Sequence, residues 1–219
     1  MDKSYIVAVD GPSGAGKSTI AQELAKSLDI AYIDTGAMYR ACALYLSERG
    51  VKNFSSTTDI VKYLSDIKIK LEPGRVLLNG RDVSKLIRTG EISRLASDIS
   101  AIKEVRDILV EMQREMGKKE SVVMDGRDIG TNVFPDADYK IFLVASLEER
   151  AKRRYKELLE RGENADLSQV KEDMRQRDHN DSTRKYNPLK QAEDAILIDS
   201  TGMGINQVVD KILKIIKER

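Results

Sequence analysis

The residues whose chemistry is plainest form a short run near the N-terminus, Gly11-Pro12-Ser13-Gly14-Ala15-Gly16-Lys17-Ser18, with Thr19 after it. The run fits the phosphate-loop pattern G-x-x-x-x-G-K-[S/T] in full. Glycines let successive backbone N–H groups point at phosphate oxygens, and the positive end of a following helix adds to the attraction. In this pattern Lys17 neutralises the β- and γ-phosphates, and Ser18 offers its hydroxyl to Mg²⁺. We therefore predict that residues 11–19 bind ATP with Mg²⁺ and that Lys17 is catalytic.

The alternative interpretation of this run is a glycine-rich turn with an exposed lysine. It fits less well, because an apolar β-rich stretch at 5–9 enters the run and an amphipathic helical pattern leaves it. A phosphate loop by itself does not distinguish a kinase from a GTPase or a motor ATPase. Evidence about the reaction must come from other segments.

The segment 34–40, Asp34-Thr35-Gly36-Ala37-Met38-Tyr39-Arg40, lies where a predicted strand gives way to a helix. Its side chains are expected at the carboxyl edge of the sheet, beside the phosphate loop. Arg40 has the fork of donors that clamps a phosphate group. Tyr39 either stacks on a ring or belongs to the core, and the isolated segment leaves both interpretations open.

Asp125 ends a predicted buried strand, which is the usual position for a carboxylate that orients Mg²⁺ through water. Arg127 and Asp128 follow it and are expected to project from the same edge. The competing interpretation of Asp125-Gly126 is an ordinary turn, because this pair is common in turns. We predict that the metal is held by Ser18 and, through water, by Asp125.

Arginines are concentrated in the last third of the chain. Glutamates stand about one helical turn from several of them, so a solvated helix face with Glu–Arg pairs is one interpretation. The other is a mobile lid that brings guanidinium groups over the transferring phosphoryl and excludes water. The residues concerned are Arg150, Arg153, Arg154, Arg161, Arg175, Arg177 and Arg184, with Asp178 and Asp181 among them.

The hydrophobic pattern supplies a scaffold for these segments. Short buried strands are predicted at 5–9, 31–33, 121–124, 139–144 and 195–198, and helices at 18–28, 39–48, 59–64, 92–100, 104–116, 147–161, 167–179 and 205–217. Strands that alternate with helices indicate an α/β fold with a parallel central sheet. Alternation at 67–71 and the turns Pro73-Gly74 and Asn79-Gly80 predict a small β-meander inserted in that fold.

Composition disfavours several other classes of protein. The 219 residues carry 37 Lys and Arg against 36 Asp and Glu, so a net charge of +1 gives no field to attract nucleic acid or a membrane. The apolar run at 5–9 is too short for a signal peptide or a membrane span, which favours a cytoplasmic protein. Cys42, the one cysteine, is interpreted as a core residue, and His179, the one histidine, lacks partners at metal-ligand spacing.

Taken together, these segments resemble the bacterial cytidylate kinases, of the nucleoside monophosphate kinase family. The resemblance runs in order along nearly the whole chain, through 11–18, 34–40, 87–89, 125–130, 133–137, 140–143, 149–151 and 177–184. It implies Mg-ATP and CMP or dCMP as substrates. It also implies one P-loop kinase unit over 1–219, with a core at 1–35, 102–147 and 185–219, a CMP-binding insert at about 36–101 and a lid at about 148–165. In that P-loop NTPase-type fold, helices cover both faces of a five-stranded parallel sheet.

The family's site residues can be carried onto matching positions of this sequence. The CMP phosphate would be held by Arg40, Arg127 and Arg184, and its sugar and phosphate side would be reached by Arg177 and Asp181. Cytosine would be read by Ser97, Arg106 and Asp128. The acceptor pocket would be lined by Thr35 and Tyr39, and the lid would add Arg150 and Arg154. Arg127, Arg150 and Arg154 would also be catalytic. Thr35 stands where the family also has serine, and the hydroxyl is retained.

The cytosine assignment has a physical rationale. The Asp128 carboxylate can accept from the amino group of cytosine while Arg106 donates to the ring acceptors. Uracil would present a carbonyl to the carboxylate instead, and an unpaired buried polar group costs about 1–3 kcal/mol. Cytosine is therefore expected to be preferred.

Two alternatives remain at this stage. The nearer one is a P-loop kinase for another acceptor, such as UMP, AMP or shikimate. The other is a nucleotide-dependent switch or a nucleic-acid-associated ATPase, which is disfavoured by the balanced charge and by the lack of an N-K-x-D guanine-reading motif in the sequence. A short lid and no apparent apolar seam favour a monomer.

Overall fold

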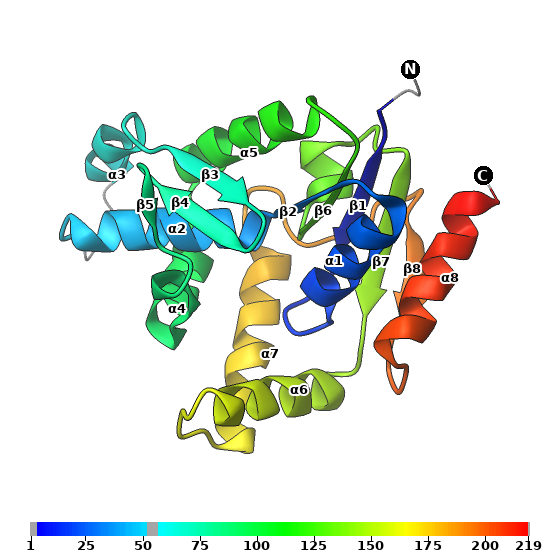
Figure 1. The fold of residues 1–219 in the computed structure, drawn as a ribbon. Helices are drawn as coiled ribbons and strands as arrows, with labels where there is room; N and C mark the ends of the chain where they lie inside the picture. The colour runs from blue at the N-terminus through cyan, green and yellow to red at the C-terminus, as the bar shows by residue number, and fades with distance from the viewer. Residues whose placement is uncertain (1–3, 52–56, 219) are drawn as a thin grey trace. The chain divides into compact units, whose positions relative to one another are not determined.

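The computed structural model describes residues 4–51 and 57–218. The chain forms two compact units (Figure 1). The first consists of Met1–Tyr32 and Glu120–Arg219, and the second of Ile33–Lys119. The chain leaves and re-enters the first unit at neighbouring points, because the N–H of Ala31 donates to the carbonyl oxygen of Ser121 at 3.2 Å.

The first unit is built on a five-stranded sheet in the order β2-β6-β1-β7-β8. Its strands are β1 (Ile6–Asp10), β2 (Ala31–Asp34), β6 (Val122–Gly126), β7 (Tyr139–Val144) and β8 (Ile196–Asp199). In the register of the parallel pairs, Asp10 lies opposite Gly126 and Phe142, so Asp10 and Asp125 end at the same carboxyl edge. The predicted α/β fold with a five-stranded parallel sheet flanked by helices is confirmed.

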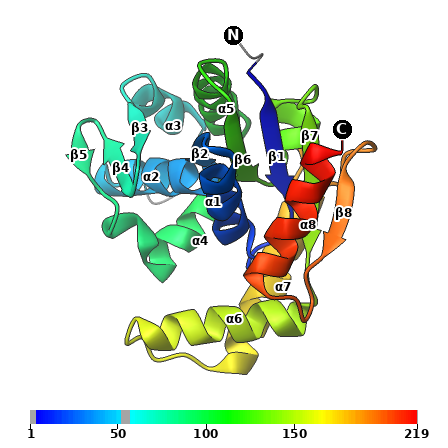
Figure 2. The same ribbon diagram turned by 45° about the vertical axis from the view of Figure 1, so that its right-hand side comes forward.

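Two helices pack together over one face of this sheet (Figure 2). They are α1 (Lys17–Leu28) and α8 (Ile205–Lys217). Leu24 of α1 and Ile212 of α8 are completely buried in one apolar cluster with Val9 and Ile141 of the strands. The helical spacing of apolar residues in both segments therefore reflects a shared core.

A helical hairpin completes the first unit. It consists of α6 (Leu147–Glu160) and α7 (Leu167–Thr183), which pack through Ala151, Val170 and Met174. Both helices begin at a side-chain cap, because Ser146 accepts a hydrogen bond from the N–H of Glu149 and Asp166 accepts one from the N–H of Gln169. The predicted lid at 148–165 corresponds to α6 and the turn after it, and its mobility stays a prediction.

The second unit combines helices with a separate three-stranded antiparallel sheet. Its central helix is α2 (Thr35–Glu48), in which Met38, Ala41 and Cys42 are fully buried, so Cys42 is a core residue as predicted. Around it are α3 (Thr57–Leu64), the strands β3 (Ile69–Glu72), β4 (Arg75–Leu78) and β5 (Arg81–Asp82), the 3-10 turn η1 (Leu86–Arg88), α4 (Gly90–Ile99) and α5 (Lys103–Gly117). The β-meander is thereby confirmed, and positive φ angles at Asn79 and Gly80 form its second turn.

The boundaries of the second unit differ from those of the predicted insert. The unit extends over Ile33–Lys119 rather than about 36–101. The segment 102–117, which the resemblance places in the core, forms α5, and its Val105 and Leu109 are buried in the apolar cluster of the second unit. The assignment of this unit to acceptor binding stays a prediction.

Three elements also differ in length from the sequence pattern. Helix α2 begins at Thr35 rather than Tyr39, because the Asp34 carboxylate caps it by accepting from the N–H of Ala37 at 2.7 Å. Helix α7 continues to Thr183 instead of ending at 179. Strand β6 continues through Gly126 instead of ending at 124, and the π-helical turn η2 (Ile129–Val133) follows it without a counterpart in the prediction.

Candidate active site

The phosphate loop connects β1 to α1, and its backbone lies against neighbouring backbone. Gly11 has φ 149°, and a Cβ atom added there would lie 2.0 Å from the carbonyl oxygen of Leu143 on β7. Only glycine fits this close approach. Helix α1 has Gly16 as its N-cap, and neither a capping side chain nor an acidic residue occupies its first turn. The helix therefore presents uncapped N–H groups, which is the arrangement that binds a phosphate.

Lys17 is buried at the start of α1, with 5% of its surface exposed. Its Nζ donates to the carbonyl oxygen of Pro12 at 2.7 Å, so the side chain folds back over the loop. Burial lowers the pKa of Lys17 to about 7; Arg127 and Arg177 lower it too, whereas Asp125 and Asp181 oppose them. The pKa of Lys17 therefore depends on four of the predicted site residues.

Ser18 and Asp125 form a pair of oxygen groups at the carboxyl edge of the sheet. The Ser18 hydroxyl donates to Asp125 Oδ2 at 2.9 Å, and the Tyr32 hydroxyl donates to Asp125 Oδ1 at 2.8 Å. Hydroxyl and carboxylate oxygens fit Mg²⁺, which usually takes few protein ligands and shares the rest of its shell with water and phosphate oxygens. Among the described residues, no group of three or more His, Cys, Asp and Glu could hold a metal ion. Ser18 and Asp125 would thus supply two oxygen groups to a Mg²⁺ ion.

Two ion pairs hold predicted substrate-binding arginines. Arg127 Nε lies 2.8 Å from Asp181 Oδ2. Arg184 Nη2 lies 3.1 Å from Asp128 Oδ1, and both of these side chains are nearly inaccessible. Burial by itself would raise the pKa of Asp181, but Arg127, Arg177 and Arg184 together hold it below its usual value. The carboxylates thus fix the guanidinium groups in place before any anion binds.

Asp128 is already engaged by the protein through both carboxylate oxygens. Oδ1 accepts from Arg184, and Oδ2 accepts from Asn132 Nδ2 at 3.0 Å. Asp128 is therefore oriented by Arg184 and Asn132.

Sequence reasoning missed Asp10, which lies at the end of β1 directly before the loop. Its Oδ1 accepts from the N–H of Ile129 and its Oδ2 from the N–H of Gly130, both at 2.8 Å. Burial raises the pKa of Asp10 to about 6, although these two N–H groups and Lys17 act in the opposite direction. Asp10 thereby anchors the segment that follows Arg127 and Asp128. Its position before Gly11 is the available signal, but the local pattern marks it only as the end of a strand.

The remaining predicted acceptor residues belong to the second unit. Arg40 is paired with Asp34 at 3.1 Å, and Thr35 is buried at the first position of α2. The Arg106 guanidinium lies 5.8 Å from the centre of the Tyr39 ring, within cation–π range. Ser97 accepts from the Ser100 hydroxyl at 2.7 Å through its carbonyl oxygen, and the carbonyl of Ser100 accepts from Arg106 at 3.3 Å. Tyr39 and Arg106 are thus brought together, and Ser97 is joined to Arg106 through Ser100.

Two predicted residues of the first unit have surroundings of a more ordinary kind. Arg154 pairs with Glu157 three residues later on α6, at 3.1 Å, as the solvated-face interpretation expected. Thr19 is exposed in the first turn of α1. By contrast Arg150, on the same helix as Arg154, is buried and bonded to the phosphate loop and to α7.

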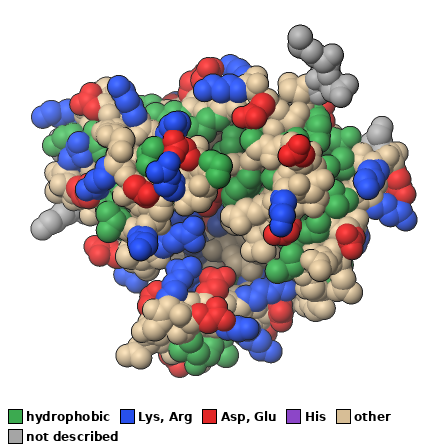
Figure 3. All heavy atoms as spheres, viewed as in Figure 1, with side chains coloured by type: hydrophobic (Ala, Val, Ile, Leu, Met, Phe, Trp, Pro, Cys, Tyr) green, Lys and Arg blue, Asp and Glu red, His purple; other side chains and the backbone are tan. Residues whose placement is uncertain are grey.

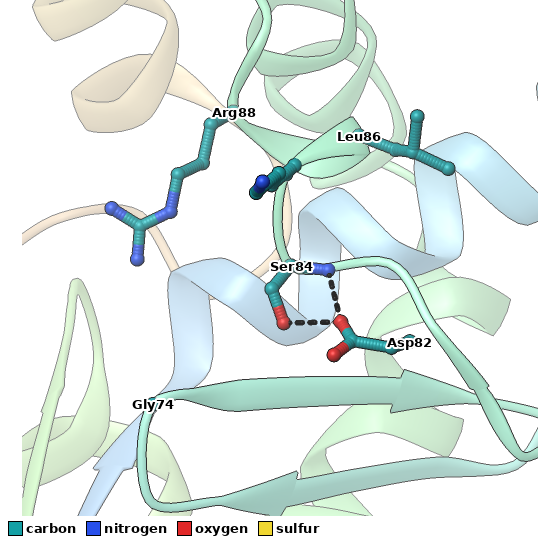
Figure 4. A pocket seen from close by; sticks show the side chains of 6 residues that line it. Gly74, Asp82, Ser84, Leu86 and Arg88 are labelled. Atoms are coloured by element: carbon teal, nitrogen blue, oxygen red, sulfur yellow. Dashed lines mark hydrogen bonds between the residues drawn. The ribbon is translucent and has the colours of Figure 1, made fainter.

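A hollow lies on the second unit. It has a volume of about 590 Å³ and is lined by Gly74, Asp82, Ser84, Lys85, Leu86 and Arg88 (Figure 4). The Ser84 hydroxyl donates to Asp82 at 2.6 Å inside it. None of the predicted site residues lines this hollow, so it adds nothing to the nucleotide sites.

The fold and the loop define the class of protein. A parallel sheet whose first strand runs into a phosphate loop and then a helix is the P-loop NTPase-type fold. The crystal structure of a gluconokinase from Sinorhizobium meliloti covers 96% of this chain and 90% of its own, with a TM-score of 0.52 at 14% identity. An uncharacterized protein from Eubacterium ventriosum covers 99% and 100%, with a TM-score of 0.57 at 14% identity. These two likenesses concern the fold alone.

The chain belongs to the cytidylate kinase family, whose model matches residues 7–218. A cytidylate kinase from Caldicellulosiruptor bescii is 51% identical over 97% of this chain and 96% of its own length. One from Thermosipho melanesiensis is 50% identical over 97% of each. The family assignment made from the sequence is therefore confirmed.

Proposed function

We propose that this chain is a nucleoside monophosphate kinase that transfers the γ-phosphoryl group of ATP to CMP or dCMP, giving ADP and CDP or dCDP. The observation that carries the proposal is the phosphate loop with Lys17 folded back over it, together with the Ser18–Asp125 hydrogen bond and the Arg127–Asp181 ion pair. Membership of the cytidylate kinase family supports CMP or dCMP as the acceptor.

The chemistry is direct in-line transfer. The attacking oxygen of the acceptor phosphate is already anionic, so no strong general base is required. The loop N–H groups and Lys17 hold the β- and γ-phosphates, and Arg127 neutralises charge on the transferring group. Ser18, and Asp125 through water, would hold Mg²⁺, which supplies further charge neutralisation when bound. Positioning and electrostatic stabilisation then account for most of the rate enhancement.

On the acceptor side, Arg127 and Arg184 bind the phosphate of CMP, and Arg177 and Asp181 reach its sugar. Asp128 accepts a hydrogen bond from the cytosine amino group. The roles of Thr35, Tyr39, Arg40, Ser97 and Arg106 in the second unit, and those of Arg150 and Arg154 in the lid, stay predictions.

A panel of acceptors tests the proposal. CMP, dCMP, UMP, AMP and shikimate are each incubated with Mg-ATP, and ADP formation is followed. CMP and dCMP are expected to be phosphorylated faster than UMP and AMP. A preference for shikimate would reject the nucleotide acceptor altogether, and rapid ADP formation without any acceptor would favour the ATPase alternative.

Charge distribution gives little support to a nucleic-acid partner. Basic and acidic side chains are interspersed over the face seen in Figure 3, in keeping with the net charge of +1. Within residues 4–51 and 57–218, none of the helices has the length and apolar character needed to cross a bilayer. The monomeric state and the cytoplasmic location stay predictions.

A further inference from the structure

Arg150 joins three segments of the first unit. Its Nη1 donates to the carbonyl oxygen of Ser13 in the phosphate loop at 3.0 Å and lies 2.7 Å from Asp178 Oδ2 on α7. Its Nε donates to the carbonyl oxygen of Ala145, just after β7, at 3.0 Å. The guanidinium group therefore ties the loop to both the sheet and the hairpin helix α7.

Direct packing strengthens this tie. A Cβ atom added at Gly14 would lie 2.6 Å from Met174 Cε and 3.3 Å from Arg150 Cβ. Met174 belongs to the small apolar cluster that holds α6 and α7 together. A shift of the loop at Gly14 toward the hairpin would therefore bring its backbone against Met174 and Arg150.

Helix α7 connects these contacts to the proposed acceptor residues. Asp181 lies about one turn beyond Asp178 on the same helix, and it is paired with Arg127 at 2.8 Å. The negative charge of Asp178 also raises the pKa of Arg127. A continuous set of contacts thus runs from Ser13 through Arg150 and Asp178 to the Asp181–Arg127 pair, entirely within the first unit.

Stability alone does not explain Asp178. Its Oδ2 is bonded to Arg150, but its Oδ1 is buried and has no hydrogen-bond donor among the described residues. The Asp178 side chain as a whole is 25% exposed, but this inaccessible oxygen lacks a donor, and well-packed apolar residues often stabilise a fold as much as an ion pair does. The carboxylate therefore points to a role in binding.

We propose that Asp178 is a positioning residue that couples the two nucleotide sites. By holding Arg150 against Ser13, it fixes the phosphate loop relative to α7. A triphosphate bound in the loop then favours the arrangement of α7 that binds the acceptor, and the acceptor favours the arrangement that binds the triphosphate, as linkage requires. The inference rests on the proposed function, because both nucleotides must bind.

The test measures coupling rather than activity. The Kd of CMP is determined by calorimetry, alone and with a saturating non-hydrolysable Mg-ATP analogue, and the ratio of the two values is the coupling factor. The wild-type factor is expected to lie in the range of about 5- to 150-fold that is typical of coupled sites. In Asp178→Asn we expect it to fall to within about twofold of unity, with a smaller change in the Kd of CMP alone.

Matched variants separate coupling from general damage. Glu172→Gln removes an exposed ion pair with Arg175 on the same helix and is expected to leave the coupling factor unchanged. Asp178→Glu keeps the charge and is expected to restore much of the coupling. If Asp178→Asn does not fold, Arg150→Lys serves instead, because it keeps the charge and loses the fork that joins Ser13 to Asp178.

The outcomes are distinguishable. CMP binding with an undiminished coupling factor in Asp178→Asn or Arg150→Lys would overturn this inference and leave the proposed function intact. A wild-type factor of unity would do the same. Failure of the wild-type chain to bind CMP at all would refute the proposed function, and the inference with it.

Discussion

Replacing Asp10 by asparagine probes the electrostatics of the segment that carries Arg127 and Asp128. Burial raises the pKa of Asp10 to about 6, from an ordinary value of 3.8. A carboxylic acid with a raised pKa in the folded chain stabilises the fold fully below its unfolded pKa. This contribution is lost as the pH rises through the folded pKa.

The magnitude follows from these two values. The full contribution is about 3 kcal/mol, and about 1.4 kcal/mol of it is lost between pH 5 and pH 8. An asparagine side chain cannot titrate, so the comparison isolates this one group. The wild-type advantage in free energy of unfolding over Asp10→Asn should therefore be larger at pH 5 than at pH 8 by about 1.4 kcal/mol.

Urea denaturation of both proteins at pH 5 and pH 8, followed by circular dichroism, provides the measurement. Titrating groups that do not interact with Asp10 are common to both proteins and cancel in the difference; Lys17, which interacts with Asp10 and has a pKa of about 7, is removed from the comparison by making both measurements in a Lys17→Met background. Asp138→Asn is a suitable control, because Asp138 accepts from the N–H of Ile6 at 2.8 Å at the other end of β1 but is exposed. A difference between wild type and Asp10→Asn that is the same at both pH values would refute the reasoning.

Two further predictions concern the phosphate loop. Lys17→Ala is expected to lower turnover by several orders of magnitude with the fold retained, because it removes the charge on the β- and γ-phosphates, whereas Lys26→Ala at the exposed end of α1 should be nearly silent in the same kinetic assay. Near-normal turnover of Lys17→Ala would count heavily against the mechanism. Gly11→Ala should prevent stable folding, because its Cβ would lie 2.0 Å from the Leu143 carbonyl oxygen, whereas Gly50→Ala, with φ 74° and open space around it, should cost about 1–2 kcal/mol in thermal or urea unfolding. Similar losses in the two glycine variants would contradict the packing of the loop against β7.

The elements of the fold were predictable where the signal is local. Strand β1, the phosphate loop and α1 are specified by contiguous residues, and their observed bounds differ from the expected ones by about one residue. The end of α7 was harder to predict, because its last buried apolar residue is Met174 and the helix continues to Thr183 through polar residues. Apolar periodicity gives no information about a polar final turn.

The candidate site was predictable as a set of residue types, and less so as a set of partners. The sequence indicated that arginines and carboxylates gather near the loop. It could not indicate that Arg127 forms an ion pair with Asp181 whereas Arg150 forms one with Asp178, because both acids lie on one helix three residues apart. The role of Asp10 depends on N–H groups about 120 residues away, which no local pattern reports.

The hydrogen bond between Ala31 and Ser121 has an architectural consequence. Ala31 begins β2 and Ser121 directly precedes β6, the neighbouring strand, so the chain leaves and re-enters the first unit at adjacent points. Because the ends of the second unit are close together, a short connector could replace it. A change of length between the two attachment points is therefore expected to leave the phosphate loop undisturbed.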